Sequence, residues 1–225
     1  MVRWIVFLLA MSSLGLAQLC DQPFSPVRAN WEWQYRVTGE NPTTYSVRRT
    51  NITESGFMAV QQNAQGRGET KFRCTLEGLT PIDFGGRGPT QAGVGGGGVD
   101  LDITVKSVRG VQIPDLDRWA VGERWGYTLE LGGTAQQGPV RFNVEGTVES
   151  LFRVVAQETV TVPAGRFQAL KVQVTTNFKI VGRAGPLSIP FNQSSESTAW
   201  YVEGVGMVKT VSRNNTTELM ALKKG

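Results

Sequence analysis

The feature that most constrains the fold is an alternation of apolar and polar side chains that recurs along the chain. Residues 31–37 read Trp-Glu-Trp-Gln-Tyr-Arg-Val, so every second side chain is apolar, as in a strand with one buried face. Similar alternation occurs in residues 45–47, 72–74, 101–105, 125–131, 140–144, 170–174 and 207–211. Past the N-terminal leader no segment has a helical apolar period over three turns, and the connections are rich in Gly, Asn and Pro. We therefore predict an all-β protein of curved antiparallel sheets, either a half-barrel or a sandwich.

Two weak internal sequence repeats suggest that the sheets are built from two related β-units. At one constant spacing, Val27, Trp31, Trp33, Tyr35 and Val37 correspond to Val121, Trp125, Tyr127, Leu129 and Leu131. At a second spacing, Phe72, Cys74, Gly78 and Leu79 correspond to Trp200, Val202, Gly206 and Met207. The prediction is a first unit at residues 18–84, a Gly-rich loop or linker at 85–98 and a second unit at 99–225, which can share one domain with the first.

The N-terminus has the pattern of a secretory signal peptide. A single Arg3 precedes the apolar residues 4–10, and small residues lead to a cleavage site after Ala17. A retained anchor is disfavoured because the apolar run is short of the roughly 20 residues that span a bilayer. Lipidation at Cys20 is disfavoured because Leu19 replaces the small residue that it requires. We expect signal peptide 1–17 and an exported protein, periplasmic or extracellular, with outer-membrane association as a further option.

Export gives meaning to the two cysteines of the chain, Cys20 and Cys74. In an oxidising compartment, an isolated pair is more often a disulfide than a metal site or a nucleophile. A bond between them would tie the mature N-terminus to the end of the first unit. We predict this disulfide as a structural link.

The composition excludes several functional classes. The chain has no histidine, so a histidine-based triad, general base or zinc site is ruled out, and no Ser-Lys spacing replaces it. The acid pairs at 100/102 and 115/117 could bind calcium only with further oxygen ligands, so solvent-facing strand acids are the favoured reading. We expect no enzymatic activity, no catalytic residues, no cofactor and no metal. The formal charge of +4 favours peripheral contact with anionic lipid, as at a membrane surface, or with polysaccharide over nucleic acid binding, and a simple solvated surface over either.

A hairpin is predicted where residues 162–172 read Val-Pro-Ala-Gly-Arg-Phe-Gln-Ala-Leu-Lys-Val. Pro163 presets the backbone for a turn, and Gly165 can adopt the positive φ that lets the chain return. Phe167 lies on one phase of the alternation and Leu170 on the other, which predicts a β-bulge near Ala169.

This hairpin motif, together with residues 200–209 (Trp-Tyr-Val-Glu-Gly-Val-Gly-Met-Val-Lys), resembles the TapB family of exported bacterial proteins. Residues 31–35 and 72–79 are similar to the N-terminal half of the same proteins. The resemblance implies a curved antiparallel sheet, related at a distance to the half-barrels of the LolA and LolB lipoprotein carriers. It implies no catalytic residues.

Aromatic strand residues are the candidates for function. Indoles two residues apart share a strand face, so an open concave face would present them as an apolar groove. The candidate ligand-binding residues are Trp31, Trp33, Trp125, Tyr127 and Trp200. We expect a non-enzymatic envelope protein acting as a binding or interaction module, with an unknown envelope protein or a hydrophobic ligand as its partner. The alternative is a periplasmic carrier of a lipid or a lipoprotein acyl chain. The favoured interpretation of the aromatic residues, a tightly packed core between two sheets, argues against the carrier.

Overall fold

The computed structural model describes residues 19–85 and 99–225 of the chain. The predicted signal peptide, 1–17, lies outside the described residues, as does all but Gly85 of the predicted Gly-rich loop at 85–98. The strands are β1 Glu32–Gly39, β2 Thr43–Thr50, β3 Gly56–Asn63, β4 Gly66–Thr75, β5 Gly78–Asp83, β6 Val99–Gly110, β7 Ile113–Pro114, β8 Arg124–Gln137, β9 Val140–Val162, β10 Gly165–Ala184, β11 Leu187–Val202, β12 Gly206–Ser212 and β13 Asn215–Lys223. A short 3₁₀ turn, η2, covers Leu116–Arg118. Within these ranges no helix is long and apolar enough to cross a membrane.

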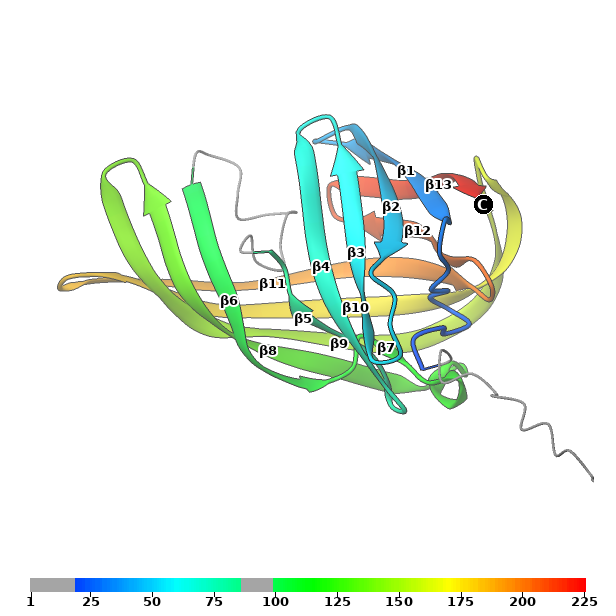
Figure 1. The fold of residues 1–225 in the computed structure, drawn as a ribbon, viewed down its shortest axis with the longest axis horizontal. Coiled ribbons are helices and arrows are strands. Elements are labelled where there is room, and N and C mark those ends of the chain that lie inside the picture. Colours follow the sequence, from blue (N-terminus) through cyan, green and yellow to red (C-terminus); the bar gives the residue numbers. More distant parts are fainter. Residues whose placement is uncertain (1–18, 86–98) are drawn as a thin grey trace, which may run out of the picture.

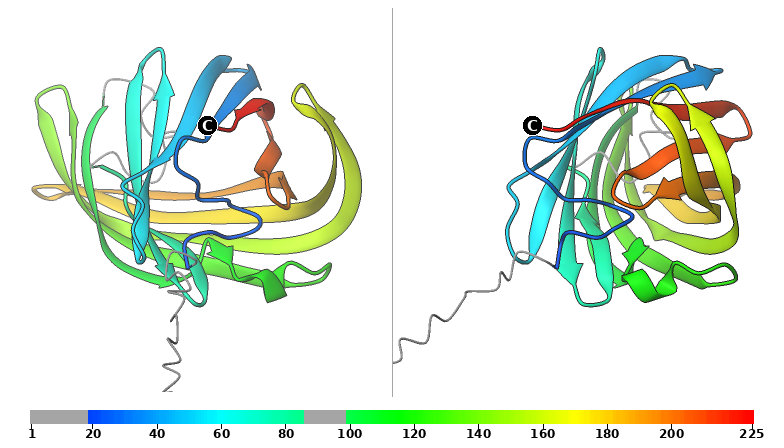
Figure 2. Two further views of the ribbon diagram at one scale, coloured as in Figure 1. Left: turned by 45° about the vertical axis from the view of Figure 1, so that its right-hand side comes forward. Right: turned by 90° about the vertical axis from the view of Figure 1, so that its right-hand side faces the viewer.

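All the strands belong to one antiparallel sheet with the order β6-β8-β9-β10-β11-β12-β13-β1-β2-β3-β4-β5-β7. The sheet curls around a concave interior without closing into a barrel, since β6 and β7 form its two edges in the described structure (Figure 1 and Figure 2). The all-β fold class and the curved antiparallel arrangement are thereby confirmed. Of the two predicted shapes, the single curled sheet corresponds to the half-barrel and not to a sandwich of two sheets.

The two halves of the sequence join within the sheet. Strands β1–β5 come from the predicted first unit and β6–β13 from the second, and β1 pairs with β13 from Glu32–Lys223 to Gly39–Asn215. The first and last strands of the chain therefore lie side by side in the middle of the sheet. The common origin of the two units stays a prediction.

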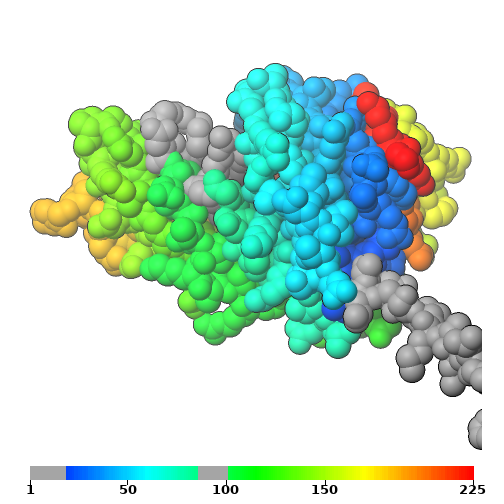
Figure 3. Space-filling view, viewed as in Figure 1, coloured from blue at the N-terminus to red at the C-terminus, as the bar shows by residue number. Residues whose placement is uncertain are grey.

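The longest ladder is the hairpin of β9 and β10, which begins at the predicted turn. Val162 and Gly165 are paired across Pro163 and Ala164, and Gly165 has a φ of 143°, a conformation that favours glycine. The bulge lies between Lys171 and Val172, two residues beyond the predicted position at Ala169. The hairpin of β10 and β11 projects furthest from the body of the molecule (Figure 3).

Three apolar clusters form the core. The first joins the N-terminal segment to strands on both sides of the concave space: Cys20, Phe24, Val27, Phe57, Cys74, Leu79, Ile113, Trp119, Trp125, Phe152, Val154 and Val172. The second lies around the β1–β13 joint: Trp33, Tyr35, Val160, Val162, Ala169, Trp200, Val202, Val208 and Leu219. The third cluster lies on β6, β8 and β9 and consists of Ile103, Leu129, Leu131 and Val148. Aromatic stacking is frequent in the first cluster, as between Trp125 and Phe152, whose ring centroids are 5.5 Å apart.

The predicted disulfide between Cys20 and Cys74 is present and fixes the N-terminal segment to β4. Past the disulfide, Phe24 stacks on Trp119 with ring centroids 4.3 Å apart, and Trp119 in turn contacts Trp125 and Tyr201. The segment between Cys20 and β1 therefore covers one end of the concave space.

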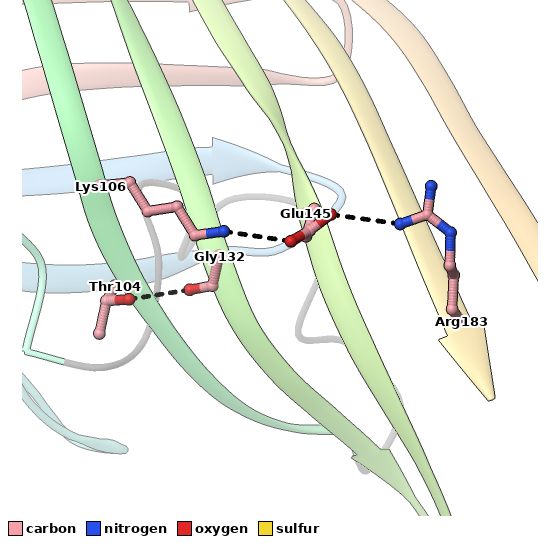
Figure 4. A network of polar contacts seen from close by, with 5 residues as sticks. All are labelled: Thr104, Lys106, Gly132, Glu145 and Arg183. Atoms are coloured by element: carbon pink, nitrogen blue, oxygen red, sulfur yellow. Dashed lines mark hydrogen bonds and ion pairs between the residues drawn. The ribbon is translucent and has the colours of Figure 1, made fainter. Parts of the chain in front are cut away.

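A polar network links four neighbouring strands, β6, β8, β9 and β10 (Figure 4). Lys106 of β6 reaches across β8 to Glu145 of β9 at 3.2 Å, and Arg183 of β10 pairs with the same carboxylate at 3.2 Å. Gly132 on β8 leaves room for this crossing, because a Cβ there would displace the end of the Lys106 side chain. Gly132 also accepts a hydrogen bond from the Thr104 hydroxyl.

Candidate functional site

A cavity of about 200 Å³ opens on the concave side of the sheet. Strands β1–β4 form one wall, and the N-terminal segment, β7 and the β11–β12 connection form the other. The lining residues are Phe24, Ser25, Pro26, Trp33, Tyr35, Tyr45, Val47, Arg49, Phe57, Gln61, Phe72, Gln112, Ile113, Tyr201, Val205, Gly206 and Met207. A concave, largely aromatic space with a few polar groups is the usual form of a small-molecule site.

The aromatic walls are held in place by hydrogen bonds and stacking. The Trp33 indole donates to the carbonyl of Val205 at 2.7 Å, and the Tyr35 hydroxyl donates to that of Met207 at 2.9 Å. Tyr35 stacks on Tyr45 at 5.1 Å. Because Trp33 and Tyr35 are anchored to backbone, this part of the cavity wall is preformed and needs no ligand to hold it in place.

Arg49 is the one cation among the residues that line the cavity. It shares the inward phase of β2 with Tyr45 and Val47. Its guanidinium lies over the Trp33 ring at 5.1 Å and over the Phe57 ring at 5.6 Å, which are cation–π contacts. Among the described residues, the guanidinium of Arg49 has no carboxylate partner and no hydrogen bond. Its Nε is buried and unsatisfied. Burial lowers the pKa of this guanidinium, yet arginine stays cationic at neutral pH.

Five further polar side chains line the cavity with no side-chain hydrogen bond to the described part of the chain: Ser25, Gln61, Gln112, Tyr45 and Tyr201. Burial raises the pKa of Tyr45 to about 12, and burial followed by the neighbouring Tyr127 raises the pKa of Tyr201 to about 12. Both phenols therefore keep their protons at neutral pH and can donate. The site offers a guanidinium, three hydroxyls and two amides, so it is richer in donors than in acceptors.

Of the five predicted binding residues, the structure places Trp33 at the cavity. Trp31 lies before β1 beside a surface depression that Arg28 and Glu203 also line, and Lys224 lies over its ring at 4.7 Å. Trp125 and Tyr127 pack into the first core cluster, where the Trp125 indole donates to the carbonyl of Gln112 at 3.0 Å.

Trp200 is in the second cluster but is not part of the cavity wall. Its indole donates to Glu158 at 2.8 Å, and Lys171 and Lys209 lie over the ring at 5.4 and 5.9 Å. Its neighbour Tyr201 reaches the cavity instead, because successive residues of a strand point to opposite faces. Apart from Trp33, the predicted binding residues therefore do not line this cavity.

Sequence reasoning did not single out Arg49 as a site residue. The signal was the phase of β2, in which Tyr45, Val47 and Arg49 alternate with polar Ser46 and Arg48. A cation on the apolar phase of a strand must either reach solvent or pair with another group. The ring-lined cavity itself was less accessible to prediction, because β1, β2 and β3 face residues more than a hundred positions away, such as Tyr201 and Met207, across it.

Fold and site together define an open, curled antiparallel β-protein with a preformed aromatic cavity. Residues 143–224, about a third of the chain, match the family model described as DUF3108-like. A search of curated proteins gives no match.

Among solved structures, a candidate exported protein with a YmcC-like fold from Bacteroides fragilis is 18% identical, with a TM-score of 0.50 over 90% of this chain and 100% of that chain. A candidate lipoprotein from Parabacteroides distasonis is 18% identical, with a TM-score of 0.46 over 91% of this chain and 99% of that one. The hypothetical lipoprotein YmcC from Escherichia coli is 10% identical, with a TM-score of 0.40 over 92% and 90%. The first similarity shows a shared fold and nothing about a shared ligand.

Proposed function

We propose that this chain is an exported, non-enzymatic binding protein of the bacterial envelope whose aromatic cavity takes a hydrophobic ligand. The observation that carries the proposal is the preformed cavity around Trp33, Tyr35 and Phe57. The resemblance to the TapB family and, at a distance, to the LolA and LolB carriers supports the same role. So does the fold shared with a candidate exported protein. Between the interaction module and the carrier, the cavity favours the carrier.

The size of the cavity limits the ligand. About 200 Å³ is roughly seven times the ~30 Å³ that a water molecule occupies in the liquid, and a methylene group is of similar size. At about 0.8 kcal/mol per methylene, a buried tail of that length gains about 6 kcal/mol before the cost of association. Micromolar binding needs about 8 kcal/mol net. A ligand of this size therefore needs polar contacts in addition to its tail.

Fluorescence titration of the purified mature protein with 1-octanol and octanoate tests the proposal, because Trp33 lies in the cavity wall. We expect a saturable change in the wild type that Val47→Phe abolishes by filling the cavity. The control is Val140→Phe, which adds the same ring at an exposed position. Absence of saturable binding in the wild type, or unchanged binding in Val47→Phe, would contradict the carrier function.

A second candidate function, contact with an anionic membrane surface, is favoured by the end of the β10–β11 hairpin. Leu187, Ile189 and Phe191 are 52%, 47% and 36% exposed and share one phase of β11. Residues 179–192 contain two basic side chains, Lys179 and Arg183, and no acidic one. Exposed apolar side chains beside basic ones fit the interface of a bilayer that carries negative headgroups.

Sedimentation with phosphatidylglycerol vesicles tests this second function. We expect binding that weakens with salt and is reduced by Ile189→Glu. Ser188→Glu is the matched control, because it introduces the same charge at the adjacent exposed residue on the opposite phase of β11. Equal loss in both variants would assign the effect to charge alone and remove the role of the apolar residues.

A further inference from the structure

We propose that the cavity binds a carboxylate at Arg49, so that its ligand is a single-chain amphiphile with an anionic carboxylate head and a short apolar tail. This inference rests on the proposed function, which it narrows from hydrophobic ligands in general to one chemical class.

The first argument is the position of Arg49 in the strand. Arg48, one residue earlier, points to the opposite face, where its side chain is 64% exposed and pairs with Glu32. Arg49 points inward among Trp33, Phe57 and Tyr35, where the solvation of its charge is reduced. Burying a cation without a counter-ion opposes folding. Arg49 is half-buried on the apolar phase and its Nε is buried without a hydrogen bond, which points to a partner from outside the chain.

The second argument is that the described residues offer no internal anion. The carboxylate on the neighbouring strand, Glu32, lies on the opposite face and is occupied by Arg48, Gln34 and Lys223. The titratable groups that face Arg49 from the packed elements are the phenols of Tyr35, Tyr45 and Tyr201. Burial raises the pKa of all three, so they are neutral donors at physiological pH. A ligand that brings acceptor oxygens completes this set of donors.

The third argument selects a carboxylate over a phosphate. A single cation balances one negative charge, which is the charge of a carboxylate, whereas a phosphate monoester carries about −1.5 to −2 at pH 7. The planar guanidinium also matches the two coplanar oxygens of a carboxylate. The remaining volume beside Phe57, Phe72 and Val47 is apolar and accepts a short tail but not the two acyl chains of a phospholipid.

The experiment compares three probes of equal chain length, octanoate, 1-octanol and octyl phosphate, by calorimetric titration of the purified mature protein. We expect the wild type to bind octanoate at least ten-fold more tightly than 1-octanol and more tightly than octyl phosphate. In Arg49→Met the preference for octanoate over 1-octanol falls below two-fold, while 1-octanol is still bound. The control Arg153→Met, which removes an exposed arginine from β9, keeps the wild-type preference.

The outcomes separate this inference from the proposed function. Equal affinity of the wild type for octanoate and 1-octanol overturns the role of Arg49 and leaves the carrier function standing. Tighter binding of octyl phosphate overturns the assignment of a carboxylate. Binding of none of the three overturns both. Because the wild-type comparison is sufficient for each of these outcomes, the test holds even if Arg49→Met does not fold.

Discussion

Arg48 and Arg49 are neighbours with the same side chain and opposite environments. Arg48 donates to Glu32 at 2.6 Å on the outer face and remains mostly in solvent. Arg49 lies against Trp33 and Phe57, where ring contacts replace only part of the lost hydration. Residues retained for binding often lower the stability of the unliganded protein, because an unoccupied site is not optimised for folding. Arg49 has the environment of such a residue.

Replacing Arg49 with methionine is expected to leave the unliganded protein as stable as the wild type or about 1 kcal/mol more stable. The physical reason is that an apolar chain of similar length fills the same space without a desolvated charge. Thermal or denaturant unfolding measures the change, with Arg48→Met as the comparison. Loss of more than about 1 kcal/mol in Arg49→Met would show that the cation–π contacts dominate and that Arg49 is a structural residue.

A second prediction at the scale of residues concerns Glu32 and the pH dependence of stability. Hydrogen bonds from Arg48, at 2.6 Å, and from Gln34, at 2.7 Å, lower the pKa of this buried carboxyl below its usual 4.5. A group whose pKa is lowered by folding stabilises the protein above its unfolded pKa, and the contribution is lost as pH falls through the folded pKa.

Glu32→Gln should therefore cost about 1–2 kcal/mol at pH 7 and less as the pH falls below about 4.5. Denaturant unfolding between pH 7 and pH 3 measures this difference, with the exposed Glu54→Gln as control. A cost that stays constant down to pH 3 would contradict the role of the ionised carboxylate.

At the scale of elements, alternation in the sequence predicted strands that the structure contains, but not their lengths. The turn at Pro163 and Ala164 was predictable because proline and Gly165 restrict the backbone locally. The 23 residues of β9 and the 20 of β10 were not, because their outer parts are partly exposed on both faces and lose the two-residue contrast. The displaced bulge at Lys171 has the same origin, since a ladder register is set by both strands together.

Two glycines of this ladder make a matched pair for a test. A Cβ at Gly146 would overlap the Lys179 carbonyl oxygen and the Ile180 backbone, whereas a Cβ at Gly182 would meet atoms no closer than 3.7 Å. Gly146→Ala should destabilise the protein by about 1–3 kcal/mol because the neighbouring backbone must shift. Gly182→Ala should be neutral or slightly stabilising. Equal effects in denaturant unfolding would mean that β9 and β10 are not packed as closely as the structure shows.

At the scale of the whole molecule, the pairing of β1 with β13 could not be predicted from alternation. Both strands alternate, but the choice of partner depends on contacts such as Lys223 with Glu32 and Ala164 with the carbonyl of Leu219, which join distant parts of the chain. The disulfide was predictable because two cysteines in a chain that is expected to be exported permit one internal pairing. The effect of the disulfide on the site was not predictable, because it depends on the N-terminal segment folding back over the concave space.

That segment connects the disulfide to the cavity. Cys20 is bonded to Cys74 of β4, and a few residues later Phe24, Ser25 and Pro26 contribute to the cavity wall. Removing the bond in a Cys20→Ser, Cys74→Ser double variant releases a constraint on a loop of this length, worth about 4 kcal/mol in the chain-entropy model. It also frees the wall to move away from Trp33 and Arg49.

We therefore expect the double variant to lose about 2–5 kcal/mol of unfolding free energy and, while still folded, to bind octanoate several-fold more weakly than the wild type. Unfolding and calorimetric titration at a temperature well below the transition measure the two effects separately. Phe24→Ala provides the comparison, because it removes a wall residue with the disulfide intact and should reduce binding as well. If the double variant loses stability but binds octanoate as the wild type does, the N-terminal segment stabilises the fold without shaping the site.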